Sequence, residues 1–179
     1  MENGNKETGR LLEIVSLAKD FCELCENSAE FTRIEFTDRS LDLLPRIYWN
    51  FFDLHPEGVS LGEFDYFSSY VNEELYEDIR KGIAAVMGEY DIFLDTFEED
   101  MQYSETPISA SISEGMADLF QSLFDFVSIV RDSEGLQIED AYMNCREDFE
   151  NYWSQTLCNI LKALNNIKYG SRNNEEEYD

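Results

Sequence analysis

The chain has few basic residues. It holds 13 lysines and arginines against 39 aspartates and glutamates, which gives a formal net charge of −26. Between Leu61 and Ile160 the imbalance is greater, because 23 carboxylates stand against four basic side chains. Nucleic-acid backbones and anionic bilayers are bound largely through lysine and arginine contacts. We therefore exclude direct nucleic-acid and membrane binding, and three alternatives stay open: a basic protein partner, a bound cation, or solubility alone.

Histidine and the common catalytic motifs are also scarce. His55 is the only histidine, which excludes histidine-rich zinc sites and the Glu-x-x-His pairs of di-iron bundles unless another chain supplies ligands. The nine glycines are scattered, and the sequence has no G-x-G-x-x-G, Walker or G-x-S-x-G pattern. We therefore predict no catalytic residue and no cofactor, with Mg²⁺ or Ca²⁺ as the weaker alternative.

Long apolar runs are missing, and the first ten residues contain no apolar signal core. A membrane span takes about 18 consecutive apolar residues, so we expect a cytoplasmic protein. The cysteines fall on the apolar stripes of predicted helices, where we expect reduced, buried thiols: Cys22, Cys25, Cys145 and Cys158. The last two lie on one predicted helix about 20 Å apart by helical rise, which argues against a shared zinc site.

Apolar residues at helical spacing are abundant. Hydrophobic residues make up 43% of the chain, too many for a disordered polyanion. From Leu136 to Tyr169 the apolar positions advance by about 3.6 residues per step, the α-helical period. A second stripe predicts a helix over Ile112–Arg131, begun by a capping box of Ser111 and Glu114. The short turn between these two helices favours an antiparallel hairpin.

Three earlier helices follow from the same period, over residues 8–26, 31–51 and 72–88. Pro45 is expected to kink or divide the second of them. Asn72 is suited to cap the third and Gly88 to end it. No alternating pattern indicates a sheet, so the stretches 55–70 and 89–109 are expected to connect helices.

The predicted fold class is therefore all-α. We expect a single-domain bundle of about five to six helices over residues 8–170, with the last two helices paired as a hairpin. Residues 1–7 are expected to form a disordered N-terminus and residues 171–179 an acidic disordered tail.

Two stretches of the sequence resemble a known family. They are DIFLDTFEEDMQYSETPISASISEGMADLFQSLFDFVS at 91–128 and CREDFENYWSQTLCNILKAL at 145–164. Together with the upstream segments LLPRIY and YVNEELYEDIRKGIAAVMG, they are similar to the uncharacterised bacterial family domain of unknown function 5063, from about Leu12 to Gly170. The resemblance implies a helical domain and brings no activity with it.

One polar line stands out on the predicted helix 112–131. Its positions recur at spacings of four and three residues, which places them beside the apolar stripe: Glu114, Asp118, Gln121, Asp125 and Ser128. Such a line can meet a basic partner, chelate a hard cation, or form an ordinary solvated helix face. A metal site requires a second carboxylate line opposite, for which the candidates are Glu139, Glu147 and Glu150.

Glu73, Glu74 and Glu77, in the segment EELYE, resemble half of the metal-binding motif of all-α nucleotide pyrophosphatases. The Glu-x-x-Asp half is missing at a suitable distance downstream, and glutamates after an Asn cap are explained by the positive helix N-terminus.

We therefore expect a non-enzymatic, acidic, cytoplasmic protein-interaction domain with Glu114, Asp118, Gln121 and Asp125 as its polar surface. The alternative is a divalent-cation-dependent hydrolase of a phosphorylated or nucleotide substrate in a carboxylate-lined site. The oligomeric state stays open, because the aromatic run from Tyr48 to Phe52 suits either a core or a dimer interface.

Overall fold

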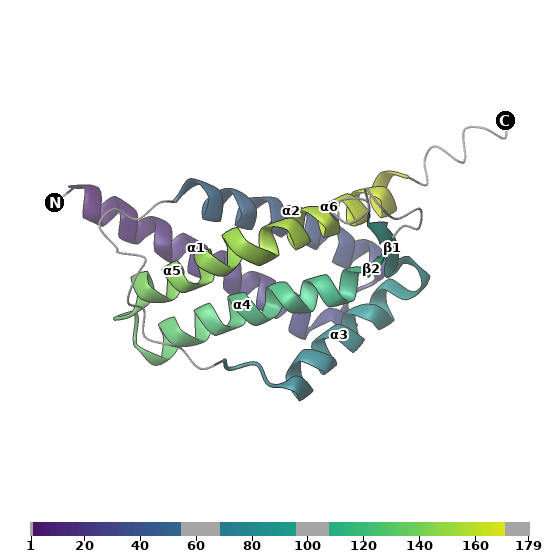
Figure 1. Ribbon diagram of the computed structural model, residues 1–179, viewed down its shortest axis with the longest axis horizontal. Coiled ribbons are helices and arrows are strands. Elements are labelled where there is room, and N and C mark those ends of the chain that lie inside the picture. The colour runs from purple at the N-terminus through teal and green to yellow at the C-terminus, as the bar shows by residue number, and fades with distance from the viewer. Residues whose placement is uncertain (1, 55–68, 96–107, 171–179) are drawn as a thin grey trace.

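The computed structural model describes residues 2–54, 69–95 and 108–170, without the side chains of residues 2–7, 95 and 108. Within these ranges the chain is a bundle of α-helices with one small sheet (Figure 1). The helices are α1 (Glu2–Glu26), α2 (Arg33–Asp53), α3 (Glu73–Met87), α4 (Ile112–Asp132), α5 (Ile138–Asp148) and α6 (Ser154–Tyr169). Two 3₁₀ turns, η1 (Ser28–Glu30) and η2 (Gly88–Tyr90), follow α1 and α3. The all-α class is confirmed.

Helix α4 is the centre of the bundle. It packs against α1, α3, α5 and α6, and it is buried on nearly every side. The predicted stripe is confirmed, with Met116, Leu119 and Leu123 fully buried. Ala117 and Ile129, on other faces, are buried as well. A helix that is apolar around most of its circumference belongs in the core, because each face needs a packing partner.

The predicted antiparallel hairpin is formed by α4 and the segment made of α5 and α6, which lies alongside α4 (Figure 1). The chain reverses at Glu134 and Gly135, whose φ angles are 52° and 82°. Gly135 donates its backbone N–H to the Val130 carbonyl at 2.8 Å, which closes the end of α4.

The expected single helix over 136–169 contains a π-helical turn at Phe149–Trp153, between α5 and α6. Cys145, Phe149, Trp153 and Leu157 are all buried and lie four residues apart. Three successive steps of four exceed the 3.6-residue period, so an ordinary helix would rotate these side chains off the core. The wider π turn absorbs the excess and keeps all four side chains inside.

The predicted helix ends are largely confirmed. The Asn72 side chain accepts a hydrogen bond from the Leu75 N–H at 2.8 Å, and α3 ends at Gly88 with φ 58°. Pro45 does not divide α2, because the flanking Leu44 and Ile47 are buried and hold the helix together. The Tyr48–Phe52 run is split between core and surface.

Phe51 packs in the core against Trp153 at a ring distance of 5.0 Å. Trp49 and Phe52 are exposed and contact each other at 5.9 Å. Part of the run therefore belongs to the core.

Two sequence predictions were wrong within the described residues. Helix α1 begins at Glu2, inside the stretch 1–7 expected to be disordered, since no proline interrupts the backbone there. The stretch 89–109 was expected to be a plain connection, but it holds strands β1 (Ile92–Asp95) and β2 (Ile108–Ser111), paired antiparallel. These strands are four residues long, too short to give a detectable alternation. His55, most of the predicted connection 55–70 and the predicted tail 171–179 lie outside the described residues.

No helix in the described ranges combines the length and apolarity that a membrane span requires.

Candidate functional site

The four polar positions predicted on α4 do not share one environment. Glu114 and Gln121 are exposed, whereas Asp118 and Asp125 are half-buried. Each aspartate accepts a hydrogen bond from a segment distant in the chain. The predicted line is therefore divided into two places, one around Asp118 near the start of α4 and one around Asp125 further along it. Ser128, the fifth position of the spacing, is buried.

Asp125 anchors the chain that leads into α3. Its carboxylate accepts hydrogen bonds from the Ser69 hydroxyl at 2.8 Å and from the Tyr70 backbone N–H at 2.7 Å. Burial raises the pKa of Asp125, although these donors oppose the rise. The pKa of Asp148 on α5 is also raised, first by burial and then by Glu147 and Asp125. These contacts give Asp125 a structural role.

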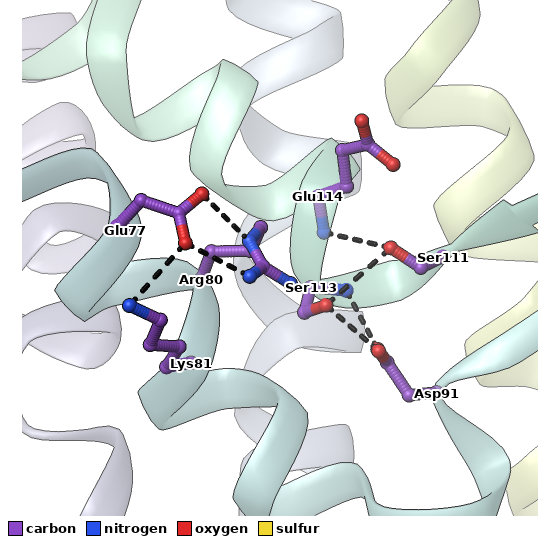
Figure 2. A network of polar contacts seen from close by, with 7 residues as sticks. All are labelled: Glu77, Arg80, Lys81, Asp91, Ser111, Ser113 and Glu114. Carbon is purple, nitrogen blue, oxygen red and sulfur yellow. Dashed lines mark hydrogen bonds and ion pairs between the residues drawn. The ribbon is translucent and has the colours of Figure 1, made fainter. Parts of the chain in front are cut away.

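Two backbone N–H groups at the N-terminus of α4 donate hydrogen bonds to side chains of this chain (Figure 2). Asp91 accepts hydrogen bonds from the Ser113 backbone N–H at 2.8 Å and from the Ser113 hydroxyl at 2.7 Å. The Ser111 hydroxyl accepts from the Glu114 N–H at 3.1 Å. Figure 2 shows the Glu114 carboxylate pointing away from Ser111, so only half of the predicted capping box forms. The Glu114 carboxylate is thus released from a capping role.

An open groove of about 300 Å³ lies beside Asp118, and we call it the α4–α6 groove. Its walls are the N-terminal half of α4, the start of α6 and one face of the sheet. The side chains that set its chemistry are Glu114, Asp118, Tyr152, Gln155, Asn159 and Phe93. Among the described residues, no lysine or arginine lines it.

Gly115 lets α6 approach α4 at the base of this groove. A Cβ atom at this position would lie 2.8 Å from the Ile160 Cδ1 and 3.0 Å from the Thr156 Cγ2. Since real Cβ atoms do not approach other atoms that closely, the helix spacing depends on glycine here. Tyr152 reaches the same groove from the π-helical turn and is 63% exposed. Turns of this kind recur at functional sites.

The charged side chains that line the α4–α6 groove within the described residues are acidic, and Arg80, which is bonded to Glu77, interacts with Glu114 from outside the lining. Burial raises the pKa of Asp118, and nearby Glu114 adds to the rise, while a hydrogen bond from the Tyr76 hydroxyl at 2.7 Å opposes it. The phenol pKa of Tyr152 is raised, with Asp118 as the largest cause. The phenol pKa of Tyr76 is raised by burial and by its bond to Asp118. Each raised pKa means that the ionised form of the group is disfavoured in this groove. A cation bound nearby would stabilise the ionised form and lower the pKa.

The two basic residues of α3, near this groove, are already paired with a carboxylate of the same helix. Arg80 on α3 donates two hydrogen bonds to Glu77, at 3.0 and 2.9 Å, and Lys81 pairs with the same carboxylate at 3.5 Å (Figure 2). Glu77 therefore holds both basic residues of α3, and the acidic segment EELYE is not arranged as a metal site. Glu73 and Glu74 are exposed in the first turn of α3, where the helix N-terminus favours them.

A larger open groove of about 540 Å³ lies between α1, η1 and α2, and we call it the α1–α2 groove. It contains carboxylates and arginines together. Asp42 accepts a hydrogen bond from Arg46 at 3.1 Å, and the Arg39 guanidinium lies over the Phe31 ring at 4.5 Å. The negative charge of this groove is therefore partly compensated by Arg39 and Arg46, which also line it.

Metal and thiol chemistry gain no support in the described ranges. No group of three or more His, Cys, Asp or Glu side chains there is arranged to hold a metal ion. The wall facing Glu114 and Asp118 carries the amides Gln155 and Asn159, not the carboxylates expected from α5. Residues Glu139, Glu147 and Glu150 are exposed elsewhere, and Glu150 accepts a hydrogen bond from Arg146 at 2.8 Å.

The thiols are mostly buried. Cys22, Cys25 and Cys145 lie in the core, and burial raises their pKa values. Glu26 and Glu23 add to the rise at Cys22, as their positions in the sequence indicate. Cys158 is exposed, contrary to expectation, because it lies on the outer face of α6.

Comparison with known proteins identifies relatives of the same architecture. The crystal structure of protein BF1032 from Bacteroides fragilis is similar to this chain, with a TM-score of 0.75 and 29% sequence identity. The match covers 89% of this chain and 92% of that protein. A search of the curated proteins gave no match. The family model described as "Domain of unknown function (DUF5063)" matches residues 5–170. The chain therefore belongs to the DUF5063 family.

Proposed function

We propose that this domain is a non-enzymatic cytoplasmic interaction module that binds a basic segment of a protein partner in the α4–α6 groove. One observation carries the proposal. The groove holds Glu114 and Asp118 beside the Tyr152 ring, and among the described residues no basic side chain lines it. A partner's lysine or arginine supplies the missing positive charge. The buried thiols of α1 and α5 suit a reducing compartment.

The chemistry of the groove fits a long basic side chain. A guanidinium or ammonium group can donate charge-assisted hydrogen bonds to Glu114 and Asp118 and make a cation–π contact with the Tyr152 ring. The volume of about 300 Å³ is at the lower end for a small-molecule site, so it suits one or two side chains. Gln155 donates to Asn159 Oδ1 at 3.1 Å, and this amide pair offers further polar atoms at the rim.

The proposal is tested with a fluorescently labelled lysine-rich peptide and fluorescence anisotropy. We expect the double variant Glu114→Gln/Asp118→Asn to bind this peptide about tenfold more weakly, which corresponds to about 1.4 kcal/mol. The amide at 118 still accepts the Tyr76 hydrogen bond, so the fold is retained. Tyr152→Leu is expected to weaken binding by about threefold, since a partly exposed cation–π contact contributes about 0.5–1 kcal/mol.

The matched control removes the same charge from the larger groove. Asp20→Asn/Glu30→Gln changes two lining carboxylates of the α1–α2 groove, and we expect an affinity within about twofold of the unaltered protein. An equal loss in both double variants would mean that net charge alone attracts the peptide. No loss in either would remove the α4–α6 groove as the binding site.

A further inference from the structure

The small sheet presents two different faces. In its register Phe93 pairs with Ala110, and both residues line the α4–α6 groove. The neighbouring residues Ile92 and Leu94 lie on the opposite face, where they are 61% and 62% exposed. Successive residues of a strand point to opposite faces and paired residues share a face, so one face of the sheet leads to the acidic groove, and the other carries Ile92 and Leu94 beside their partners Ser111 and Ser109. We call this second face, on which the two apolar side chains are exposed, the apolar face.

The sheet is also short of strands. Within the described residues it consists of β1 and β2 only, each four residues long. A two-stranded ribbon is marginally stable in water and gains stability from a third strand. The outer edge of such a ribbon carries backbone N–H and C=O groups that another extended chain can pair with.

We propose that the partner of the α4–α6 groove binds as an extended strand added to this sheet, with basic and apolar residues in alternation. The inference rests on the proposed function and names the form of its partner. Basic side chains on the groove face reach toward Glu114 and Asp118, while the intervening apolar side chains lie beside Ile92 and Leu94. Backbone hydrogen bonds supply affinity and the alternating side chains supply specificity, as in other cases of strand addition.

Charge complementarity selects this occupant over a second copy of the chain. Each copy has a formal net charge of −26, so two copies repel one another. A helical partner is also disfavoured, because a period of 3.6 residues places its basic and apolar residues on faces that do not match the two faces of a sheet.

The first experiment compares three labelled peptides: one with lysine and valine in alternation, one with the same residues segregated into two blocks, and the alternating one with N-methylated backbone amides. We expect the alternating peptide to bind about tenfold more tightly than either of the others, because only it combines both faces with backbone hydrogen bonds. Hydrogen exchange is expected to slow at backbone amides of Ile92–Asp95 or Ile108–Ser111 when the alternating peptide is bound.

The second experiment alters the apolar face. Ile92→Thr/Leu94→Thr keeps residues suited to a strand, and we expect the alternating peptide to bind about fivefold more weakly while the segregated peptide is unaffected. Ile34→Thr, at an isoleucine of α2 that is 66% exposed, is the control and should change neither affinity.

The outcomes separate this inference from the proposed function. Equal binding of the three peptides, with the dependence on Glu114 and Asp118 intact, would overturn strand addition and leave the proposed function standing. Binding that ignores Glu114 and Asp118 would overturn the proposed function. Self-association that is lost in Ile92→Thr/Leu94→Thr would assign the apolar face to a second copy and overturn the inference.

Discussion

The two grooves of this protein differ in how their acidic charge is balanced. In the larger α1–α2 groove, Asp38 accepts a hydrogen bond from Lys168 at 2.7 Å, and Asp42 pairs with Arg46 at 3.1 Å. In the smaller α4–α6 groove, Asp118 is hydrogen-bonded by a neutral phenol and Glu114 points away from its cap. The larger groove therefore contains its own cations, whereas the smaller one lacks them in the described part of the chain.

Under the proposed function, neither the volume of a groove nor the number of its carboxylates identifies a cation-binding surface. What matters is whether the protein has already compensated the charge. Exposed ion pairs contribute little to stability, about 0–1 kcal/mol each, but they occupy carboxylates that a partner would otherwise use. By this criterion the groove of about 300 Å³ is a better candidate than the one of about 540 Å³.

The largest effect is expected from the helix spacing on which the smaller groove depends. Gly115→Val would push against Ile160 and Thr156, so we expect a loss of about 1–3 kcal/mol in the free energy of unfolding. Gly9→Val is the control, because no atom lies within 4 Å of a Cβ at that position. We expect its effect to stay within about 0.5 kcal/mol, measured by urea unfolding. Equal losses in the two variants would mean that the helix propensity of valine, and not the contact between α4 and α6, causes the loss of stability.

A smaller effect is expected from removing the cations of the larger groove. In the Glu114→Gln/Asp118→Asn background, Arg39→Gln/Arg46→Gln exposes uncompensated carboxylates in the α1–α2 groove. We expect the affinity for the lysine-rich peptide to recover by about fivefold, since each nearby ion pair is equivalent to less than about 1 kcal/mol. Lys81→Gln/Arg131→Gln makes the same change in net charge elsewhere and should restore little. A similar recovery in both would attribute peptide binding to net charge.

The helices of this fold could be predicted from the sequence because their information is local. The 3.6-residue period of α4 and the Asn72 cap of α3 depend on residues within one or two turns. The π-helical turn was also visible in principle, because Cys145, Phe149, Trp153 and Leu157 lie at three successive spacings of four. That excess over the helical period is a signal that sequence reasoning missed.

The candidate site was only partly predictable, because its polar contacts join distant segments. Asp118 meets Tyr76 across 42 residues, and Asp125 meets Tyr70 across 55. No local spacing on α4 indicates that these two aspartates are half-buried while Glu114 is free of its cap. Asp91, which caps α4 from 22 residues upstream, is likewise invisible to a local pattern. The position of the polar line was predicted, but its division into an anchor and a groove depends on tertiary packing.

The smallest effect concerns the pH dependence of stability in the α4–α6 groove. Because burial raises the pKa of Asp118, the folded state binds its proton more tightly than the unfolded state. Stability from this group therefore falls as pH rises from the ordinary aspartate value of 3.8 through the raised pKa, and it stays reduced at neutral pH. Asp118→Asn cannot ionise and keeps an acceptor for Tyr76. We expect its stability relative to the unaltered protein to increase over this range by less than about 1 kcal/mol, given partial solvent screening.

Glu77, which lies outside the lining of the groove, is expected to show the opposite pH dependence of stability. Arg80 lowers the pKa of Glu77, so its contribution to stability is present above the ordinary value of 4.5 and is lost as pH falls through the lowered pKa. Glu77→Gln should therefore lose stability at neutral pH and match the unaltered protein in acid. Urea midpoints measured from about pH 2.5, below the lowered pKa of Glu77, up to about pH 7 distinguish the two carboxylates. If Asp118→Asn instead loses stability at neutral pH as Glu77→Gln does, Asp118 is already compensated by a cation, and the contrast between the two grooves fails.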